Sequence, residues 1–152
     1  MTTFKPFQIS DIDNIVVMMH DFYAIDGYPI DVEMAAQLLQ TFIADDQLGK
    51  GWLIVFDDKI IGYVVLTFVF SFEYKGRIAF LDELYLAESS RGKGIGKQVV
   101  DFVHQKAVDL DIKIIYLEVE GHNKTAQKLY LSKDFVIHNR QLMKLIPKNP
   151  LI

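Results

Sequence analysis

The sequence contains no cysteine, which excludes disulfide bonds, thiolate metal sites and any intermediate carried on a thiol of the chain. It also lacks a long apolar segment, because the most apolar run, residues 60–70, is too short to cross a bilayer as a helix. No basic region followed by an apolar one opens the chain, so no signal peptide is expected. We therefore expect a cytoplasmic protein that does not act at a membrane.

The sequence also lacks a large excess of charge of either sign. The 16 basic and 20 acidic residues give a net charge of −4, which offers no reason to expect a nucleic acid as partner and fits a cationic one. The four histidines show no metal-ligand spacing, so no metal site is expected. With 152 residues, of which 51% are hydrophobic, the chain can bury a sizeable core. Residues 1–152 are expected to form a single domain.

Hydrophobic periodicity predicts an α/β fold. Strand-like runs separated by turn residues predict antiparallel hairpins in the first half, and the order strand, glycine turn, helix, strand, helix predicts a crossover between parallel strands in the second. The result is a mixed, mostly antiparallel twisted sheet of about seven strands with helices on both faces. The expected strands are residues 4–9, 51–56, 60–74, 77–86, 113–120, 135–138 and 141–146. Ser10 is expected to cap the first helix, and three further helices are expected over residues 31–44, 95–107 and 123–133.

Three glycines at alternate positions, Gly92, Gly94 and Gly96, separate a hydrophobic run from a helical segment. Such a turn presents unpaired backbone N–H groups and the positive end of a helix dipole, and bare backbone can approach a phosphate closely. The turn is therefore predicted to hold a pyrophosphate; a turn that needs glycine for steric reasons alone is the alternative. The basic residues that add attraction for a polyanion are Arg91, Lys93 and Lys97.

The two common phosphate-binding motifs do not fit this turn. A Walker A loop requires a glycine where Arg91 stands and a serine or threonine where Gln98 stands. A dinucleotide-binding fingerprint requires a glycine at Lys97. The predicted site is thus a third kind of pyrophosphate cradle.

Residues 91–96, Arg-Gly-Lys-Gly-Ile-Gly, resemble the Arg/Gln-x-x-Gly-x-Gly/Ala signature of the GNAT superfamily of N-acetyltransferases. "FLDELYL" at 80–86 stands where the fourth strand of the family runs into the cradle. "NKTAQKLYLSKDF" at 123–135 is similar to the family segment Asn-x-x-Ala-x-x-x-Tyr-x-x-x-Gly-Phe, with Asp134 in place of the usual glycine. Because the element order agrees along roughly the whole chain, the resemblance implies a GNAT fold, in which the central parallel strands splay apart.

The resemblance further implies acetyl-CoA as donor and an amine as acceptor. In the family, strand backbone beside the splay pairs with the pantetheine arm, as in peptide binding by strand addition. Asn123 either caps the following helix or bonds the CoA arm. A homodimer is also expected. The implied cofactor-binding residues are Leu84, Tyr85, Leu86, Arg91, Gly92, Lys93, Gly94, Ile95, Gly96, Lys97, Asn123, Ala126 and Tyr130.

Acetyl transfer requires that the amine lose a proton and that the departing thiolate gain one. Without cysteine, direct attack in a ternary complex is the simpler route. Tyr130 matches the family tyrosine and is the candidate acid, with a core aromatic as the alternative. Asp82 and Glu83 are neighbours on a strand, so at most one enters the cleft unless a bulge intervenes. Asp82 is preferred as base, with water as a relay, because a glutamate at its place contacts the substrate in diamine acetyltransferases; structural pairing is the alternative.

Acceptor recognition is expected from the loop that follows the first helix. Tyr23, Asp26 and Tyr28 combine aromatic and acidic character, which suits an ammonium group; a loop packed by its own tyrosine is the alternative. Glu118 faces either the cleft or solvent. We predict transfer to a small cationic amine; the alternatives are a protein N-terminal or lysine acetyltransferase and a non-catalytic acyl-CoA-binding sensor.

Overall fold

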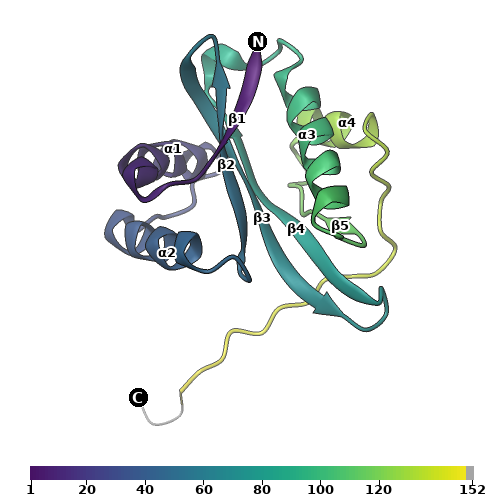
Figure 1. The fold of residues 1–152 in the computed structure, drawn as a ribbon. Coiled ribbons are helices and arrows are strands. Elements are labelled where there is room, and N and C mark those ends of the chain that lie inside the picture. The colour runs from purple at the N-terminus through teal and green to yellow at the C-terminus, as the bar shows by residue number, and fades with distance from the viewer. Residues whose placement is uncertain (150–152) are drawn as a thin grey trace.

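The computed structural model describes residues 1–149 and places helices on both faces of a five-stranded sheet (Figure 1). The strands follow one another in space in chain order, antiparallel from the first to the fourth and parallel between the last two. Two hairpin turns contain residues with positive φ, Asp58 at 62° and Lys75 at 62°, as tight hairpins require. The strands are β1 (Thr2–Pro6), β2 (Gly49–Phe56), β3 (Lys59–Ser71), β4 (Gly76–Leu86) and β5 (Ile115–Tyr116).

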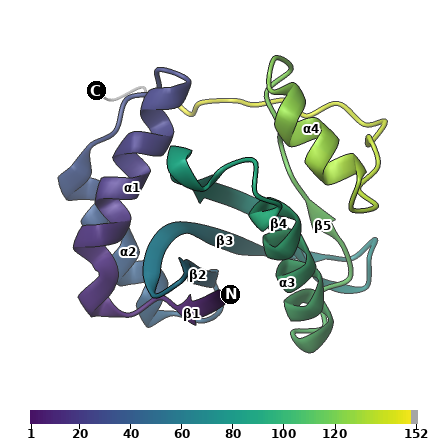
Figure 2. The ribbon, with the colours of Figure 1, turned by 90° about the horizontal axis from the view of Figure 1, so that it is seen from above.

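Helices α1 (Ile12–Ile25) and α2 (Val32–Ala44) lie on one side of the sheet, and α3 (Ile95–Asp109) and α4 (Lys124–Leu131) on the other (Figure 2). A short 3-10 helix, η1 (Ile9–Asp11), precedes α1, and another, η2 (Glu88–Ser90), follows β4. The expected cap at Ser10 is wrong, because Ser10 lies inside η1 and the Asp11 carboxylate instead accepts from the Gln8 amide at 2.9 Å. Among residues 1–149 no helix is long and apolar enough to span a bilayer.

The sheet is buried on both faces. This packing fixes the positions of β3 and β4, which border the cleft. On the α3 side, Leu66 and Val99 belong to a buried apolar cluster. On the α1 and α2 side, Ile15 and Leu53 belong to a second cluster, and both are fully buried. Successive β3 residues alternate between the two clusters, as the period of a strand requires.

The β4 strand contains one residue more than β3 beside it. Val65 pairs with Glu83 and Leu66 pairs with Leu81, so Asp82 is the extra residue of a β-bulge. The bulge changes which face each side chain joins: Leu81 packs in the α3-side cluster, whereas Tyr85, four residues later, packs in the α1-side cluster. Glu83 therefore turns towards α1.

Seven strands were expected and five form within residues 1–149. Residues 113–120 were expected to be one strand, but only Ile115–Tyr116 pair with β4, because the chain diverges from it afterwards. Residues 135–138 and 141–146 form no strand. Their apolar alternation has no partner in this fold, and Val136 and Ile137 are 83% and 87% exposed.

Candidate active site

The cleft opens where β4 and β5 separate. These parallel strands pair at Ala79–Ile115 and Phe80–Tyr116 only, so residues 81–86 of β4 have a strand partner on the β3 side alone. Extended backbone on the open side can pair with an extended ligand, as in strand addition. The Ala87 amide donates to the Ile61 carbonyl of β3 at 2.7 Å, so alternation also directs the backbone groups of Tyr85 to β3 and those of Leu84 to the open side.

The glycine turn lies at the start of α3 and has the geometry of an anion site. Gly92 and Gly94 have φ of 72° and 76°, where side chains are strained. A methyl group added at either residue would meet no protein atom within 4 Å. The backbone N–H groups of residues 92–97 donate to no other backbone group in the described chain. Six free donors around open space at a helix N-terminus fit a pyrophosphate.

The residues in and beside the turn make different contacts. Lys93 and Lys97 are exposed and free to approach an anion. The Arg91 guanidinium donates to the Leu86 carbonyl at 2.9 Å and lies 5.9 Å from the centre of the Tyr85 ring, so it ties the turn to the end of β4. A methyl group at Gly96 would lie 3.1 Å from Leu129 of α4. This third glycine therefore permits the close packing of α3 and α4.

Next to the splay lies an acidic cavity of about 500 Å³. Its walls come from α1, the α1–α2 loop, the bulge of β4 and the chain after β5. It contains five carboxylates and no lysine or arginine. The lining residues are Phe22, Tyr23, Asp26, Tyr28, Asp82, Glu83, Glu118, Val119 and Glu120.

Glu83 is held in the wall of this cavity by two tyrosines. The Tyr63 hydroxyl donates to one carboxylate oxygen at 2.6 Å and the Tyr23 hydroxyl to the other at 2.7 Å. Burial raises the pKa of Glu83, and the hydrogen bonds from Tyr63 and Tyr23 act against that rise. Burial also raises the pKa of both tyrosines, Tyr63 more strongly, so both remain protonated donors.

Asp82 lines the same cavity because the bulge intervenes, so both carboxylates face the cleft rather than one. Its carboxylate forms no hydrogen bond or ion pair with residues 1–149. Partial burial, and then the neighbouring charge of Glu118, raise the pKa of Asp82. Two adjacent carboxylates thus differ: Glu83 is fixed by donors, and Asp82 is available to take up a proton.

Two contacts between distant loops involve residues that line the acidic cavity. The Tyr28 hydroxyl donates to Glu120, and the His122 ring lies 2.9 Å from an Asp26 carboxylate oxygen. These contacts join the α1–α2 loop to the chain after β5. The His122 side chain is largely exposed, yet its ring also pairs with Asp26.

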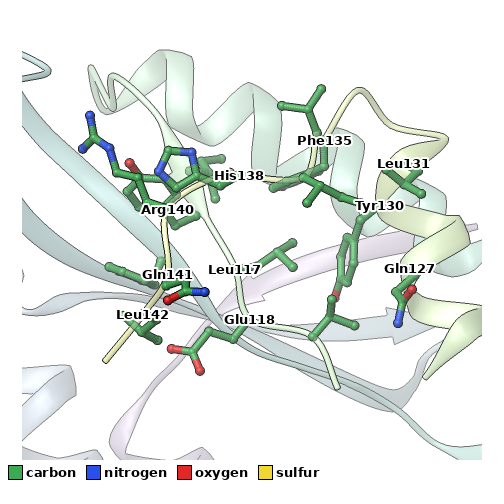
Figure 3. A pocket seen from close by; sticks show the side chains of 16 residues that line it. Leu117, Glu118, Gln127, Tyr130, Leu131, Phe135, His138, Arg140, Gln141 and Leu142 are labelled. Atoms are coloured by element: carbon green, nitrogen blue, oxygen red, sulfur yellow. The ribbon is translucent and has the colours of Figure 1, made fainter. Parts of the chain in front are cut away.

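Tyr130 lines a neighbouring cavity of about 550 Å³, where its side chain points inward beside Leu117 and Glu118 (Figure 3). The two cavities share Glu118 and Val119. Burial raises the pKa of Tyr130 to about 12, so its phenol remains protonated at neutral pH. Its ring packs against Phe135, with 5.5 Å between centres. Tyr130 is therefore both part of the packing and able to donate into the cleft.

Asn123 caps α4, since its side chain accepts from the Ala126 amide at 3.1 Å. The sequence left this role open beside a contact to the CoA arm. The Ala126 amide is engaged in the same cap. Both residues therefore set the start of the helix that carries Tyr130.

The structure thus gathers Tyr23, Asp26, Tyr28 and Glu118 with both bulge carboxylates in one cavity. Sequence reasoning missed Tyr63, since only the register of β3 against the bulge brings it to Glu83. It also gave no role to Glu120 in the cavity; the available signal was its alternation with Glu118.

Known proteins resemble this chain in sequence. Residues 16–135 match the model of a family described as "Acetyltransferase (GNAT) family". The chain is 33% identical over 109 residues to a protein named "Uncharacterized N-acetyltransferase YycN" of Bacillus subtilis, covering 66% of this chain and 69% of that protein.

Two shorter matches carry more specific names. Over 53 residues the chain is 32% identical to "D-amino-acid N-acetyltransferase HPA3" of Saccharomyces cerevisiae, covering 35% of this chain and 33% of that protein. Over 71 residues it is 34% identical to "Thialysine N-epsilon-acetyltransferase" of Bos taurus, covering 47% of this chain and 41% of that protein. The matched part thus spans less than half the length of either relative.

Solved structures show the same fold along nearly the whole chain. An integron cassette protein from the Cole Harbour Salt Marsh metagenome has a TM-score of 0.86 at 27% identity, covering 97% of this chain and 91% of that one. A predicted acetyltransferase of Clostridium acetobutylicum, solved with acetyl-CoA, has a TM-score of 0.80 at 19% identity, covering 95% of this chain and 96% of that one.

The hydrogen bond from Tyr63 gives a first testable prediction. Tyr63→Phe leaves Glu83 with one donor fewer, which raises its pKa further and lowers the free energy of unfolding near neutral pH by about 1.5–3 kcal/mol. Below about pH 4 the carboxyl is protonated in both folded and unfolded states, so the deficit shrinks there. Urea unfolding across this pH range measures it. Tyr28→Phe, which loses the exposed bond to Glu120, is the matched control and should change little. An equal deficit at both pH values would contradict the assignment.

Proposed function

Because the chain belongs to the acetyltransferase (GNAT) family, whose members use acetyl-CoA, we propose that it moves the acetyl group to the amine of a small cationic molecule by direct attack in a ternary complex. The observation that carries the proposal is the acidic cavity at the β4 bulge, on the strand that leads into the glycine turn. A polyanionic donor suits the free amides and the two lysines of the turn, and an ammonium acceptor suits a cavity with five carboxylates and no lysine or arginine.

Acetyl-CoA supplies an activated acyl thioester, and the residues of this chain bind and orient the two substrates and transfer the protons. The amides of residues 92–97 hold the pyrophosphate, and the open backbone of Leu84 aligns the pantetheine arm. The carbonyl of Leu86 already accepts from Arg91, which keeps the end of β4 beside the turn. The donor is thereby directed along the splay towards the acidic cavity.

The acceptor binds as an ammonium ion and must react as an amine. Glu83, fixed by Tyr23 and Tyr63, holds the charge, while Asp82 accepts the proton directly or through water. A neighbouring carboxylate favours the charged amine, so Asp82 must take one proton from the ammonium before the attack, because only the neutral amine has the lone pair that forms the N–C bond. Tyr130 donates its proton to the departing sulfur as the C–S bond of the thioester breaks, and the second proton of the acylated nitrogen, passed on through water, restores the phenol.

The names of two relatives support a small amine as acceptor, since one is called a thialysine and the other a D-amino-acid N-acetyltransferase. A protein acetyltransferase and a non-catalytic sensor are the competing functions that the experiments separate.

An acceptor panel tests the proposed function. Thiol release from acetyl-CoA is followed with an alkyl diamine, a matched amine that carries a carboxylate in place of the second ammonium, and a peptide amine. The diamine should give a kcat/KM at least about tenfold above the other two, since one charge contact is worth on the order of 1.4 kcal/mol. Preference for the peptide favours a protein acetyltransferase. Binding of acetyl-CoA without acceptor-dependent release favours the sensor.

The glycine turn gives a second prediction. In Gly94→Ala a methyl group projects into the open space of the cradle, so the affinity for CoA should fall about 5–150-fold, as overpacking by 1–3 kcal/mol implies. Gly27→Ala is a matched control, because Gly27 has a φ of 69° and equally open space and bears the same backbone strain. Calorimetric titration with CoA and thermal unfolding measure both variants. Unchanged CoA affinity in Gly94→Ala would refute the cradle.

The third prediction separates the base from the acid. Asp82→Asn should lower kcat/KM for the diamine by about 10–100-fold with an unchanged KM for acetyl-CoA. Because Asp82 works deprotonated and its pKa is raised, the wild-type rate falls as the pH drops through that pKa, and the variant should lack this limb. Tyr130→Phe should instead lower kcat about a hundredfold with every acceptor.

Asp58→Asn, at the exposed β2–β3 turn, is the control for the lost charge. A wild-type pH profile in Asp82→Asn would remove Asp82 from proton transfer. Normal turnover by Tyr130→Phe would return Tyr130 to a packing role.

A further inference from the structure

The helix that carries Tyr130 is held by different parts of the chain at its two ends. Just after α4, the Lys133 ammonium contacts both carboxylate oxygens of Asp101 at 2.7 Å, which ties this end of the helix to α3. The start of α4 is held instead by the turn that precedes it, residues 120–123. What fixes this turn to the helix therefore also decides where the start of the helix lies.

Gln127, near the start of α4, joins the helix to this turn. Its side-chain Nε2 donates to the Glu120 carbonyl at 3.0 Å and to the Gly121 carbonyl at 3.1 Å. The Asn123 backbone amide donates to the same Glu120 carbonyl at 3.0 Å. The Glu120 carbonyl thus accepts one hydrogen bond from within the turn and one from the helix, and these bonds fix the turn and the helix to each other.

The side chain of Glu120 connects the same turn to the acceptor side of the cleft. Its carboxylate lines the acidic cavity and accepts from the Tyr28 hydroxyl. One residue therefore has its carboxylate in the cavity and its carbonyl bound to α4. An ammonium group that binds this carboxylate contacts a residue that Gln127 fixes to the helix.

Tyr130 depends on the helix for its position. It follows Gln127 by three residues, so both side chains lie on one face of α4, and both line the same cavity (Figure 3). The Tyr130 ring packs against Phe135, but its hydroxyl makes no hydrogen bond within residues 1–149. No polar contact in this part of the chain holds the phenol, so its place in the cleft is set by the placement of α4.

We propose that Gln127 is a positioning residue that acts through Tyr130. By holding the Glu120 carbonyl to α4, it lets an ammonium group bound at the Glu120 carboxylate bring the phenol to the sulfur of the donor. The inference rests on the proposed function, because it takes Tyr130 as the acid and the acidic cavity as the acceptor site. Correct placement matters because a small displacement of a catalytic group costs a large factor in rate.

Gln127→Met tests the link, because methionine has a similar length and lacks the donor. The kcat with an alkyl diamine should fall about tenfold, which is less than the loss expected for Tyr130→Phe, since the phenol is displaced and not removed. The KM for acetyl-CoA should not change, and Gln127→Lys, which restores a donor, should recover most of the rate. Gln105→Met is the matched control, because the Gln105 side chain donates to Asp109 on the exposed side of α3; its kcat should equal that of wild type.

A double variant separates positioning from a general loss of structure. If Gln127 acts through Tyr130, Gln127→Met combined with Tyr130→Phe should be no slower than Tyr130→Phe alone. A further loss of about tenfold in the double variant would overturn the proposal. A normal kcat in Gln127→Met beside a slow Tyr130→Phe would overturn the link alone, whereas normal turnover by Tyr130→Phe would refute the proposed acid and the link together.

Fluorine NMR gives a second reading that does not require turnover. In protein labelled with 3-fluorotyrosine, the signal that Tyr130→Phe lacks belongs to Tyr130. Addition of the alkyl diamine to the complex with CoA should shift this signal in wild-type protein and in Gln105→Met, and the shift should be lost in Gln127→Met. An equal shift in wild type and Gln127→Met, or no shift in wild type, would contradict the coupling.

Discussion

In β4, Asp82 is an extra residue relative to β3, and this one bulge decides which side chains meet in the cleft. In a regular strand Glu83 would share the α3 face with Leu81. The bulge instead turns Glu83 towards α1, where Tyr23 and Tyr63 bind both of its oxygens, and leaves Asp82 in the same cavity without a donor. Bulges commonly redirect side chains beside active sites, and the acceptor side of this cleft depends on this one.

The second constraint is the divergence of β4 and β5. The two strands pair at only two positions, which leaves one edge of β4 open. The crossover through α3 begins with the glycine turn, which therefore lies at the end of this open edge. Positive potential at the turn comes from a helix dipole and free amides, and negative potential in the acidic cavity comes from five carboxylates. Separating the two charges along one cleft allows an anionic donor and a cationic acceptor to bind together.

Much of this arrangement could be predicted from the sequence. Apolar alternation and turn residues predicted β2, β3, β4 and both hairpin turns, and the glycines predicted the turn before α3. These features could be predicted because their signals are local in the sequence. The faces of Asp82 and Glu83 could not be predicted, because a bulge depends on the register between two strands. Tyr63 and His122 were missed for a related reason, since they meet Glu83 and Asp26 across 20 and 96 residues. The prediction of two C-terminal strands was wrong for residues 1–149. The segments that contain Val136 and Leu145 have the apolar alternation of a strand, but no other segment of the described chain pairs with them.

The most direct test of the central claim uses bisubstrate ligands, in which the sulfur of CoA is joined through an acetyl linker to an amine arm. One ligand ends in a second ammonium group and its matched partner ends in a carboxylate. If the cradle and the acidic cavity form one cleft, calorimetry should show the ammonium ligand binding at least about a hundredfold more tightly than CoA, because the second contact becomes intramolecular. The carboxylate ligand should gain nothing over CoA. Equal affinity of the two ligands would contradict the account.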